Sequence, residues 1–247
     1  WRDGSHLDLH LDPEASAAAV RDFAGARAED EFRAFSAKAK RLFDAFDAPV
    51  MQEPEPSLAG LTGEVLKRPK LIPAMAPGLS LARSLRMQFT DPRLRQLFGR
   101  YATYVGGSPY LSPAILGLVW HSEASGVWKV EGGMHMLARA VHDLASERGV
   151  RFHFSAKAER IEMQDGRCTA VHLADGTRLP ADVVLFNGDP KALHEGRLGP
   201  APRPAVPDRA VKPRSLSAFV WGFAAEPDGV ELTHHNVFFC DDPRIEF

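Results

Sequence analysis

Apolar side chains recur every three or four positions between residues 32 and 46, as they do on one face of an amphipathic helix. Upstream, Asp12-Pro13-Glu14 supplies an N-cap residue, a first-turn proline and an acidic first turn, which predict the start of another helix. Packing in a core explains the apolar stripe, and the lining of an apolar ligand tunnel is the alternative. The stripe consists of Phe32, Phe35, Ala39, Leu42, Phe43 and Phe46.

The block from 127 to 190 mixes helical and strand periods. A short strand is expected at 127–130, followed by the tight turn Gly132-Gly133 and a helix that ends at Gly149. Residues 150–154 alternate between apolar and polar side chains, which predicts a strand. Two Asp-Gly dipeptides, at 165–166 and 175–176, separate further alternating runs and predict two β-hairpins.

The end of this block carries a different pattern. Residues 181–186 are almost continuously apolar, which predicts a strand that is buried on both faces. The strand ends at the small, polar turn Asn187-Gly188-Asp189, and such turns at strand ends border the ligand crevice of open α/β sheets. Farther along, residues 216–224 and 234–239 are expected to form two paired strands.

The composition adds limits on function. The chain has 247 residues, of which 45% are hydrophobic and 25% charged, as in globular proteins. Its 30 Lys and Arg against 32 Asp and Glu give a net charge of −2, which argues against a nucleic-acid partner. Two cysteines without a CxxC spacing fit a reducing compartment. No metal site is expected, because the neighbouring His234 and His235 of a strand point to opposite faces.

The charge is unevenly distributed. Residues 65–100 hold eight basic side chains and one acidic side chain, whereas residues 1–64 hold 13 acidic and seven basic ones. Within the basic segment, an apolar face is formed by Leu81, Leu85 and Phe89, with Arg83 and Arg86 off that face. A basic amphipathic helix of this kind is typical of contact with a membrane surface, and packing of the same helix on a core is the alternative.

Several motifs, in order, resemble the FAD-dependent phytoene desaturase family of carotenoid oxidoreductases, and among its branches the bacterial one that desaturates hydroxy- or methoxyneurosporene. The likeness extends over almost the whole chain. The motifs are Tyr104–Pro109, Val130–Leu137, Gly149–Phe152, Ala158–Ile161, Leu173–Gly176, Asp182–Pro190, Arg214–Trp221 and His234–Phe239.

The resemblance implies an α/β (α+β) fold with two parts. One is part of a two-dinucleotide-binding-type FAD domain with an inserted β-meander, and the other is a mixed sheet-and-helix substrate domain. By position, residues 1–120 would form a substrate-binding domain whose helical, membrane-facing part is about 65–100. Residues 121–190 would form the C-terminal part of the FAD-binding domain, and residues 191–247 would supply substrate-domain strands.

The same resemblance implies which residues meet the cofactor. Gly132, Gly133 and Met134 open a helix beside the flavin. The residue at the Ala158 position meets the adenine end through its backbone, and the turn Asn187-Gly188-Asp189 lies near the cofactor. His121 and His135 are candidates for a proton relay or a hydrogen bond to the flavin, with a structural role for each as the alternative.

The implied reaction is removal of a hydride and a proton from a carbon–carbon bond of an acyclic carotenoid, with the hydride passing to FAD. Because carotenoids reside in membranes, we expect a cytoplasmic protein that is peripheral on the inner membrane face, with contact through the Arg83 and Arg86 region. No GxGxxG turn occurs in the sequence, so we expect an internal fragment that holds FAD poorly alone. The alternatives are another flavin oxidoreductase of the superfamily, such as an amine oxidase or carotenoid isomerase, and a non-catalytic relative.

Overall fold

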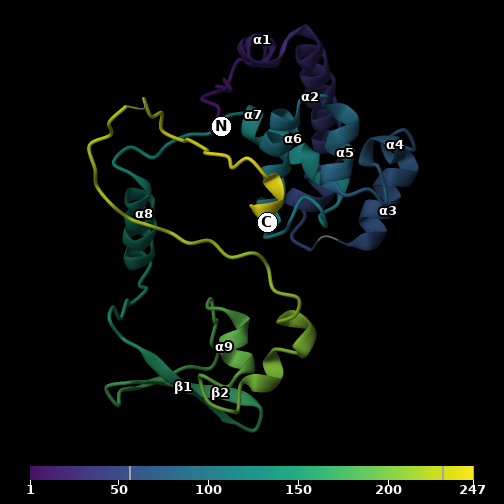
Figure 1. Cartoon of the computed structure of the whole chain (residues 1–247). Coiled ribbons are helices and arrows are strands. Elements are labelled where there is room, and N and C mark those ends of the chain that lie inside the picture. Colours follow the sequence, from purple (N-terminus) through teal and green to yellow (C-terminus); the bar gives the residue numbers. More distant parts are fainter. Residues whose placement is uncertain (56, 230, 247) are drawn as a thin grey trace. The chain divides into compact units, whose positions relative to one another are not determined.

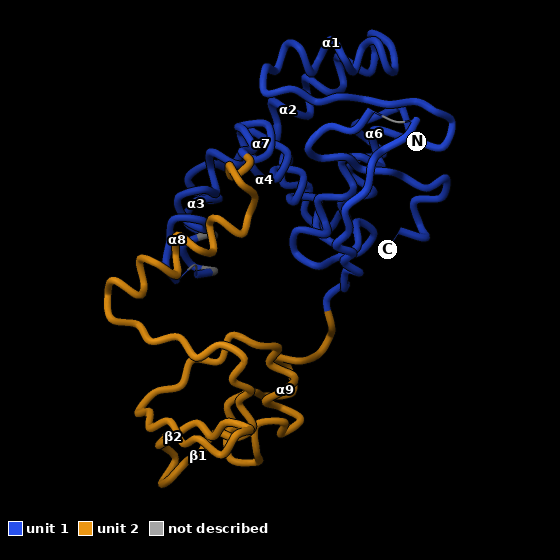
Figure 2. Tube along the Cα trace, turned by 90° about the vertical axis from the view of Figure 1, so that its left-hand side faces the viewer, with its two compact units in different colours: residues 1–128, 215–247 blue, residues 129–214 orange. Residues whose placement is uncertain are grey.

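The computed structural model describes residues 1–55, 57–229 and 231–246, except for the side chains of Leu58 and Leu61. The chain divides into two compact units, which Figure 2 shows in blue and orange. Unit 1 combines residues 1–128 with 215–247, and unit 2 comprises residues 129–214. Unit 2 is therefore inserted between the two parts of unit 1. The boundaries fall after residues 128 and 214, later than those the resemblance implies, after 120 and 190.

Unit 1 is built mainly from helices (Figure 1). The predicted start of the first helix is confirmed, because the Asp12 carboxylate accepts a hydrogen bond from the Glu14 amide at 3.0 Å and α1 begins at Pro13. Gly25, at φ +90°, separates α1 from α2. The helices are α1 (Pro13–Ala24), α2 (Ala26–Phe46), α3 (Leu58–Lys67), α4 (Leu71–Met75), α5 (Leu81–Gln88), α6 (Pro92–Gly99) and α7 (Val119–Ala124), with 3-10 segments at Arg100–Val105, Ala114–Leu118 and Pro243–Ile245 and a π-helical turn at Asp47–Met51.

The apolar stripe of α2 lies in the core of unit 1. The ring of Phe98, on α6, has its centroid 4.7 Å from that of Phe35 and 5.5 Å from that of Trp120. The Trp120 indole donates a hydrogen bond to the Ser36 hydroxyl at 2.8 Å, so its one polar group is satisfied inside the core. Core packing, rather than a tunnel lining, is therefore the role of the buried part of this stripe. Its fully or nearly buried members are Phe32, Phe35, Ala39, Leu42 and Phe46.

The second part of unit 1 joins the same core. Phe239 is buried and stacks on Trp1, with 4.9 Å between the ring centroids. The Gln96 side chain, on α6, donates a hydrogen bond to the Cys240 carbonyl at 2.9 Å. Residues after 214 therefore contribute to a core that is otherwise built from residues before 129.

The apolar face of α5 packs inward. Leu81, Leu85 and Phe89 are all buried in the core of unit 1, so these side chains are not available to enter a bilayer, as a membrane contact through this face requires. Arg83 and Arg86 lie on the exposed side of the helix. Within the described residues, no helix has the length and apolar character needed to cross a membrane.

Unit 2 contains helix α8 (Met134–Glu147) and a three-stranded antiparallel sheet in the order β1 (Ala158–Gln164), β2 (Arg167–Leu173) and β3 (Arg178–Pro180). Both predicted hairpins are confirmed, since Asp165-Gly166 joins β1 to β2 and Asp175-Gly176 lies between β2 and β3. The short helix α9 (Pro190–His194) follows, with 3-10 turns at Arg203–Ala205 and Asp208–Ala210. The fold is therefore a mixture of helices and a small antiparallel sheet.

Other predicted strands do not form. Residues 127–130, 150–154, 181–186, 216–224 and 234–239 belong to no strand, so the expectation of substrate-domain strands within 191–247 is wrong for the described residues. A strand requires a neighbour that pairs with its backbone amides and carbonyls, and no described segment supplies that neighbour. Leu185, expected to be buried on a central strand, is 94% exposed.

Candidate functional site

The turn before α8 has a conformation that glycine favours. Gly132 and Gly133 have φ angles of +75° and +88°, a region that side chains with a Cβ rarely adopt. A Cβ on Gly133 would meet no atom within 4 Å, so the space beside this residue is open. Among the described residues, no side chain caps α8, and its first turn carries no acidic residue. The positive end of the helix dipole is thus free to receive an electron-rich group.

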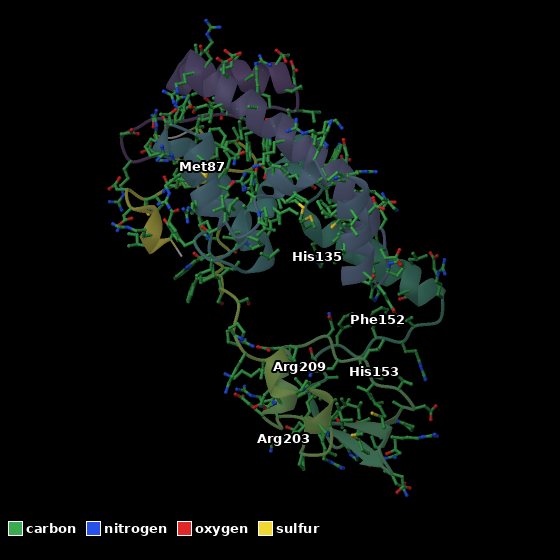
Figure 3. The ribbon with its side chains drawn as sticks, turned by 90° about the vertical axis from the view of Figure 1, so that its right-hand side faces the viewer. Met87, His135, Phe152, His153, Arg203 and Arg209 are labelled. Carbon is green, nitrogen blue, oxygen red and sulfur yellow. The ribbon has the colours of Figure 1, made fainter. Side chains whose placement is uncertain are left out.

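Met134 and His135 are the first two residues of α8, and Figure 3 labels His135. Both side chains are exposed, and so are the apolar side chains farther along the helix, among them Leu137, Val141 and Leu144. The predicted amphipathic helix is therefore present, but its apolar face buries none of its residues within the described chain.

Ala158 is the first residue of β1 and pairs with Leu173 of β2. Because β1 lies at the edge of the sheet, no strand of this sheet flanks its outer side. The small, exposed side chain leaves the backbone at this position accessible. An accessible backbone edge suits the contact with an adenine that the resemblance implies.

The turn at Asn187-Gly188-Asp189 leads directly into α9. A Cβ on Gly188 would collide with the Phe186 ring, so a larger residue there would require that partly exposed ring to move. The Asp189 carboxylate caps α9 by accepting a hydrogen bond from the Lys191 amide at 2.9 Å. Asn187 and Gly188 are exposed, and within the described residues neither takes part in a hydrogen bond to a side chain.

The Asp189 carboxylate also receives Arg214. The Arg214 guanidinium donates to its two oxygens at 3.1 and 2.7 Å, a bidentate arrangement. These hydrogen bonds, together with the helix-capping amide, lower the pKa of Asp189 to about 2. Sequence reasoning singled out Asp189 but missed its partner, because nothing in the pattern of two residues this far apart indicates that they meet.

The structure separates the two candidate histidines. His135 belongs to unit 2, together with Gly132, Gly133, Met134, Ala158 and the turn at 187–189, whereas His121 belongs to unit 1. His121 lies on α7 and its ring packs edge-on against Phe43, with 5.2 Å between centroids. Burial, together with the nearby Lys40, lowers the pKa of His121. These contacts favour a packing role for His121.

A second polar cluster escaped sequence reasoning. Glu162, on β1, accepts hydrogen bonds from Thr169, His172 and Arg178, each at 2.7 Å. Arg160 pairs with His172 and His172 with Arg178 in the strand register, so three basic side chains form one row across the sheet. The carboxylate occupies the position where they converge, which makes this cluster a structural network rather than an open site.

The family model for flavin-containing amine oxidoreductases matches residues 7–220, and the chain belongs to that family. Membership of a flavin-containing family supports FAD as the cofactor. The chain is similar to two hydroxyneurosporene desaturases over its full 247 residues, with 55% identity to that of Cereibacter sphaeroides and 48% to that of Rhodobacter capsulatus. It covers 50% of each. A 4,4'-diapolycopene oxygenase from a Methylomonas species is 35% identical over 169 residues, which are 68% of this chain and 34% of that protein.

The chain thus spans about half the length of the curated relatives it matches most fully. The residues present fit a flavin dinucleotide in one respect that the geometry supports. The space beside Gly133, in front of a helix end that no described side chain caps, is open, so a ligand can approach the backbone amides there.

Proposed function

We propose that this chain is part of an FAD-dependent desaturase that introduces a double bond into an acyclic, hydroxylated or methoxylated carotenoid. The observation that carries the proposal is the similarity to two hydroxyneurosporene desaturases, with 55% and 48% identity over the whole of this chain. Similarity to a relative with a different named activity, 4,4'-diapolycopene oxygenase, supports the broader substrate class.

FAD, when bound, supplies the acceptor for the hydride that leaves one carbon, while a proton leaves the neighbouring carbon and the bonding electrons form the double bond. The chain's own contribution is to bind and orient. The uncapped end of α8 would face an electron-rich part of the cofactor, with Gly132, Gly133 and Met134 providing backbone amides. Ala158 and the turn at 187–189 would contribute backbone contacts from two other segments of unit 2.

His135 is the histidine that we propose to bond the cofactor or relay the departing proton. Its side chain is exposed, and it lies two residues after Gly133, in the first turn of α8. His121 has the weaker case because its ring packs on Phe43 of α2. The carotenoid cation formed by hydride loss is delocalised over the conjugated chain, so the reaction does not require a strong base.

We assign the two units different roles within this proposal. Unit 2, with the glycine turn and the meander, would belong to the FAD-binding domain, and unit 1 would belong to the substrate domain. The full family fold has a glycine-rich phosphate turn, and this sequence has none, so the complete cofactor site would need residues from outside the chain.

The same proposal includes contact with the cytoplasmic face of a membrane, from which an apolar substrate must be drawn. The apolar side chains that would enter the interface are Met87 and Leu111, which are 74% and 88% exposed. The loop that carries Leu111 is held against α5, because the Ala82 amide donates to the Pro109 carbonyl at 2.9 Å. Arg83 and Arg86, exposed on the same helix as Met87, would meet anionic headgroups.

Product analysis tests the function. The FAD-loaded full-length enzyme is incubated with a hydroxylated acyclic carotene, and the product is identified by mass and absorbance. A desaturase yields a product that is lighter by two hydrogen atoms and absorbs at longer wavelength. A product of unchanged mass would point to an isomerase, and turnover of an amine instead would point to an amine oxidase. Absence of all three activities in a protein that retains FAD would favour a non-catalytic relative.

A further inference from the structure

Asp189 and Arg214 close a loop that contains the last part of unit 2. Asp189 is the N-cap residue of α9, and Arg214 is the final residue of the unit. Between them, Leu193 of α9 is buried, and the Leu198 carbonyl accepts a hydrogen bond from the Ile161 amide of β1 at 3.0 Å. The loop is therefore attached to the sheet in its middle and joined to itself at its two ends.

The geometry at Asp189 is more restrictive than that of a single surface ion pair. Asp189 and Arg214 are 49% and 55% exposed, and exposed ion pairs contribute little to stability by themselves. Here, however, one carboxylate accepts two guanidinium hydrogen bonds and one backbone amide, so its orientation is fixed from two sides. Because Asn187 and Gly188 directly precede this anchored residue, the orientation of their backbone is restricted as well.

We propose that Arg214 is a positioning residue that acts through Asp189 to hold the Asn187-Gly188 backbone in the orientation that meets FAD. This inference rests on the proposed function, which assigns the turn to the cofactor site. It also changes the role expected for Asp189. Its carboxylate binds Arg214 and caps α9, so it affects the cofactor only indirectly, by orienting the turn.

The test is a double-mutant cycle in the FAD-loaded full-length enzyme, with FAD affinity and the flavin absorbance spectrum as readouts. Arg214→Gln removes the guanidinium, and Asp189→Asn removes the carboxylate charge while keeping a good helix cap. We expect each variant to weaken FAD binding by about three- to tenfold and to alter the flavin spectrum, as loss of a positioning contact does. The double variant should bind FAD no more weakly than the weaker single one.

Two further variants control the experiment. Arg214→Lys keeps the charge but cannot form the bidentate contact, so it should restore binding only in part. Arg209→Gln removes an exposed arginine of the same unit that has no ion pair within the described residues, and it should leave FAD binding unchanged (Figure 3). Amide hydrogen exchange at Lys191 is expected to become faster in Arg214→Gln. It reports the loss of the Asp189–Arg214 contact independently of activity.

The outcomes distinguish the two levels of the proposal. Unchanged FAD affinity in Arg214→Gln would overturn the positioning role while leaving the function intact. A much larger loss in Asp189→Asn than in Arg214→Gln, with additive effects in the double variant, would show a direct contact of Asp189 with FAD and would also overturn it. A wild-type enzyme that binds no flavin would overturn the proposed function itself.

Discussion

The guanidinium of Arg100 lies 2.6 Å from the carboxylate of Glu123, and this pair joins the segment after α6 to α7. Both side chains are mostly buried, with 15% and 19% of their surface exposed. The Arg100 guanidinium also lies over the ring of Tyr101, with its Cζ atom 4.7 Å from the centroid. A carboxylate in this position neutralises a charge that would otherwise remain largely desolvated.

Removing one member of this pair should therefore destabilise unit 1. We expect Glu123→Ala to lower the free energy of unfolding by about 1–3 kcal/mol, because Arg100 is left without its counter-charge. The double variant Arg100→Met/Glu123→Leu should lose less than Glu123→Ala, since it removes both charges together. Urea unfolding measures the difference, and equal stability of wild type and Glu123→Ala would contradict the prediction.

The neighbouring Tyr101 hydroxyl offers a contrasting case. This hydroxyl is buried and has no hydrogen-bond partner of acceptable geometry among the described residues. Burial, together with the nearby negative charge of Glu123, raises the pKa of Tyr101. Because the hydroxyl has no hydrogen bond of good geometry to lose, Tyr101→Phe should change the free energy of unfolding by less than about 1 kcal/mol. A substantially larger loss would mean that the hydroxyl has a partner, and Tyr101→Leu serves as the packing control.

Acid should weaken the sheet of unit 2. Hydrogen bonds from Arg178, Thr169 and His172 hold the pKa of Glu162 far below its ordinary value of 4.5. A carboxylate with a depressed pKa adds stability above its unfolded value and loses it as pH falls toward its folded value. Stability should therefore decline below about pH 4.5 in wild type and decline less in Glu162→Gln. Hydrogen exchange of the β1 and β2 amides across this pH range measures the stability of the sheet. The same pH dependence in wild type and Glu162→Gln would contradict the prediction.

Glycine at the start of α8 should matter for the cofactor and not only for the fold. Gly133 and Gly149 flank this helix with φ angles of +88° and +87°, and neither would be crowded by a Cβ. Substitution of either by Ala should cost a similar conformational strain of about 1 kcal/mol. Only Gly133→Ala should also weaken FAD binding in the full-length enzyme. Equal FAD affinities of the two variants, measured by flavin fluorescence, would remove the α8 end from the site.

Charge reversal tests the proposed membrane-binding surface of unit 1. Arg83→Glu/Arg86→Glu should reduce sedimentation of the full-length enzyme with anionic liposomes, and Met87→Ser/Leu111→Ser should reduce it without changing charge. Arg148→Glu/Arg151→Glu makes the same change of charge on exposed residues of unit 2 and should have little effect. Unaltered liposome binding by both unit 1 variants would rule out this surface.

Local patterns predicted those features whose cause is local. The first Asp-Gly turn was identifiable because a two-residue hairpin needs residues that accept positive φ, and Asp165 and Gly166 have φ angles of +50° and +78°. In the longer second turn, Gly176 alone has a positive φ, of +88°. The core stripe of α2 was identifiable because helical spacing places its aromatic rings on one side. These signals involve neighbours along the chain, and the structure contains the features they predict.

The failures have a common physical origin. Residues 181–186 and 216–224 have the composition of strands, but a strand is completed by backbone groups of another segment, and no such segment pairs with them in the described chain. The same dependence on distant residues hid the contact of Arg214 with Asp189. At the α8 end, sequence resemblance indicated the glycines, whereas the open space beside Gly133 required coordinates.

The insertion of unit 2 within unit 1 has a consequence for synthesis. The ribosome makes residues 1–128 before residues 215–247, yet the core they form includes Phe239, which packs against Trp1. Unit 2 is synthesised before Phe239, so until then the core formed by the helices of residues 1–128 lacks this side chain. During this interval, the two hairpins of unit 2 can form, since β1, β2 and β3 all lie between residues 158 and 180. The sheet of unit 2 is therefore complete in sequence before the core of unit 1 is.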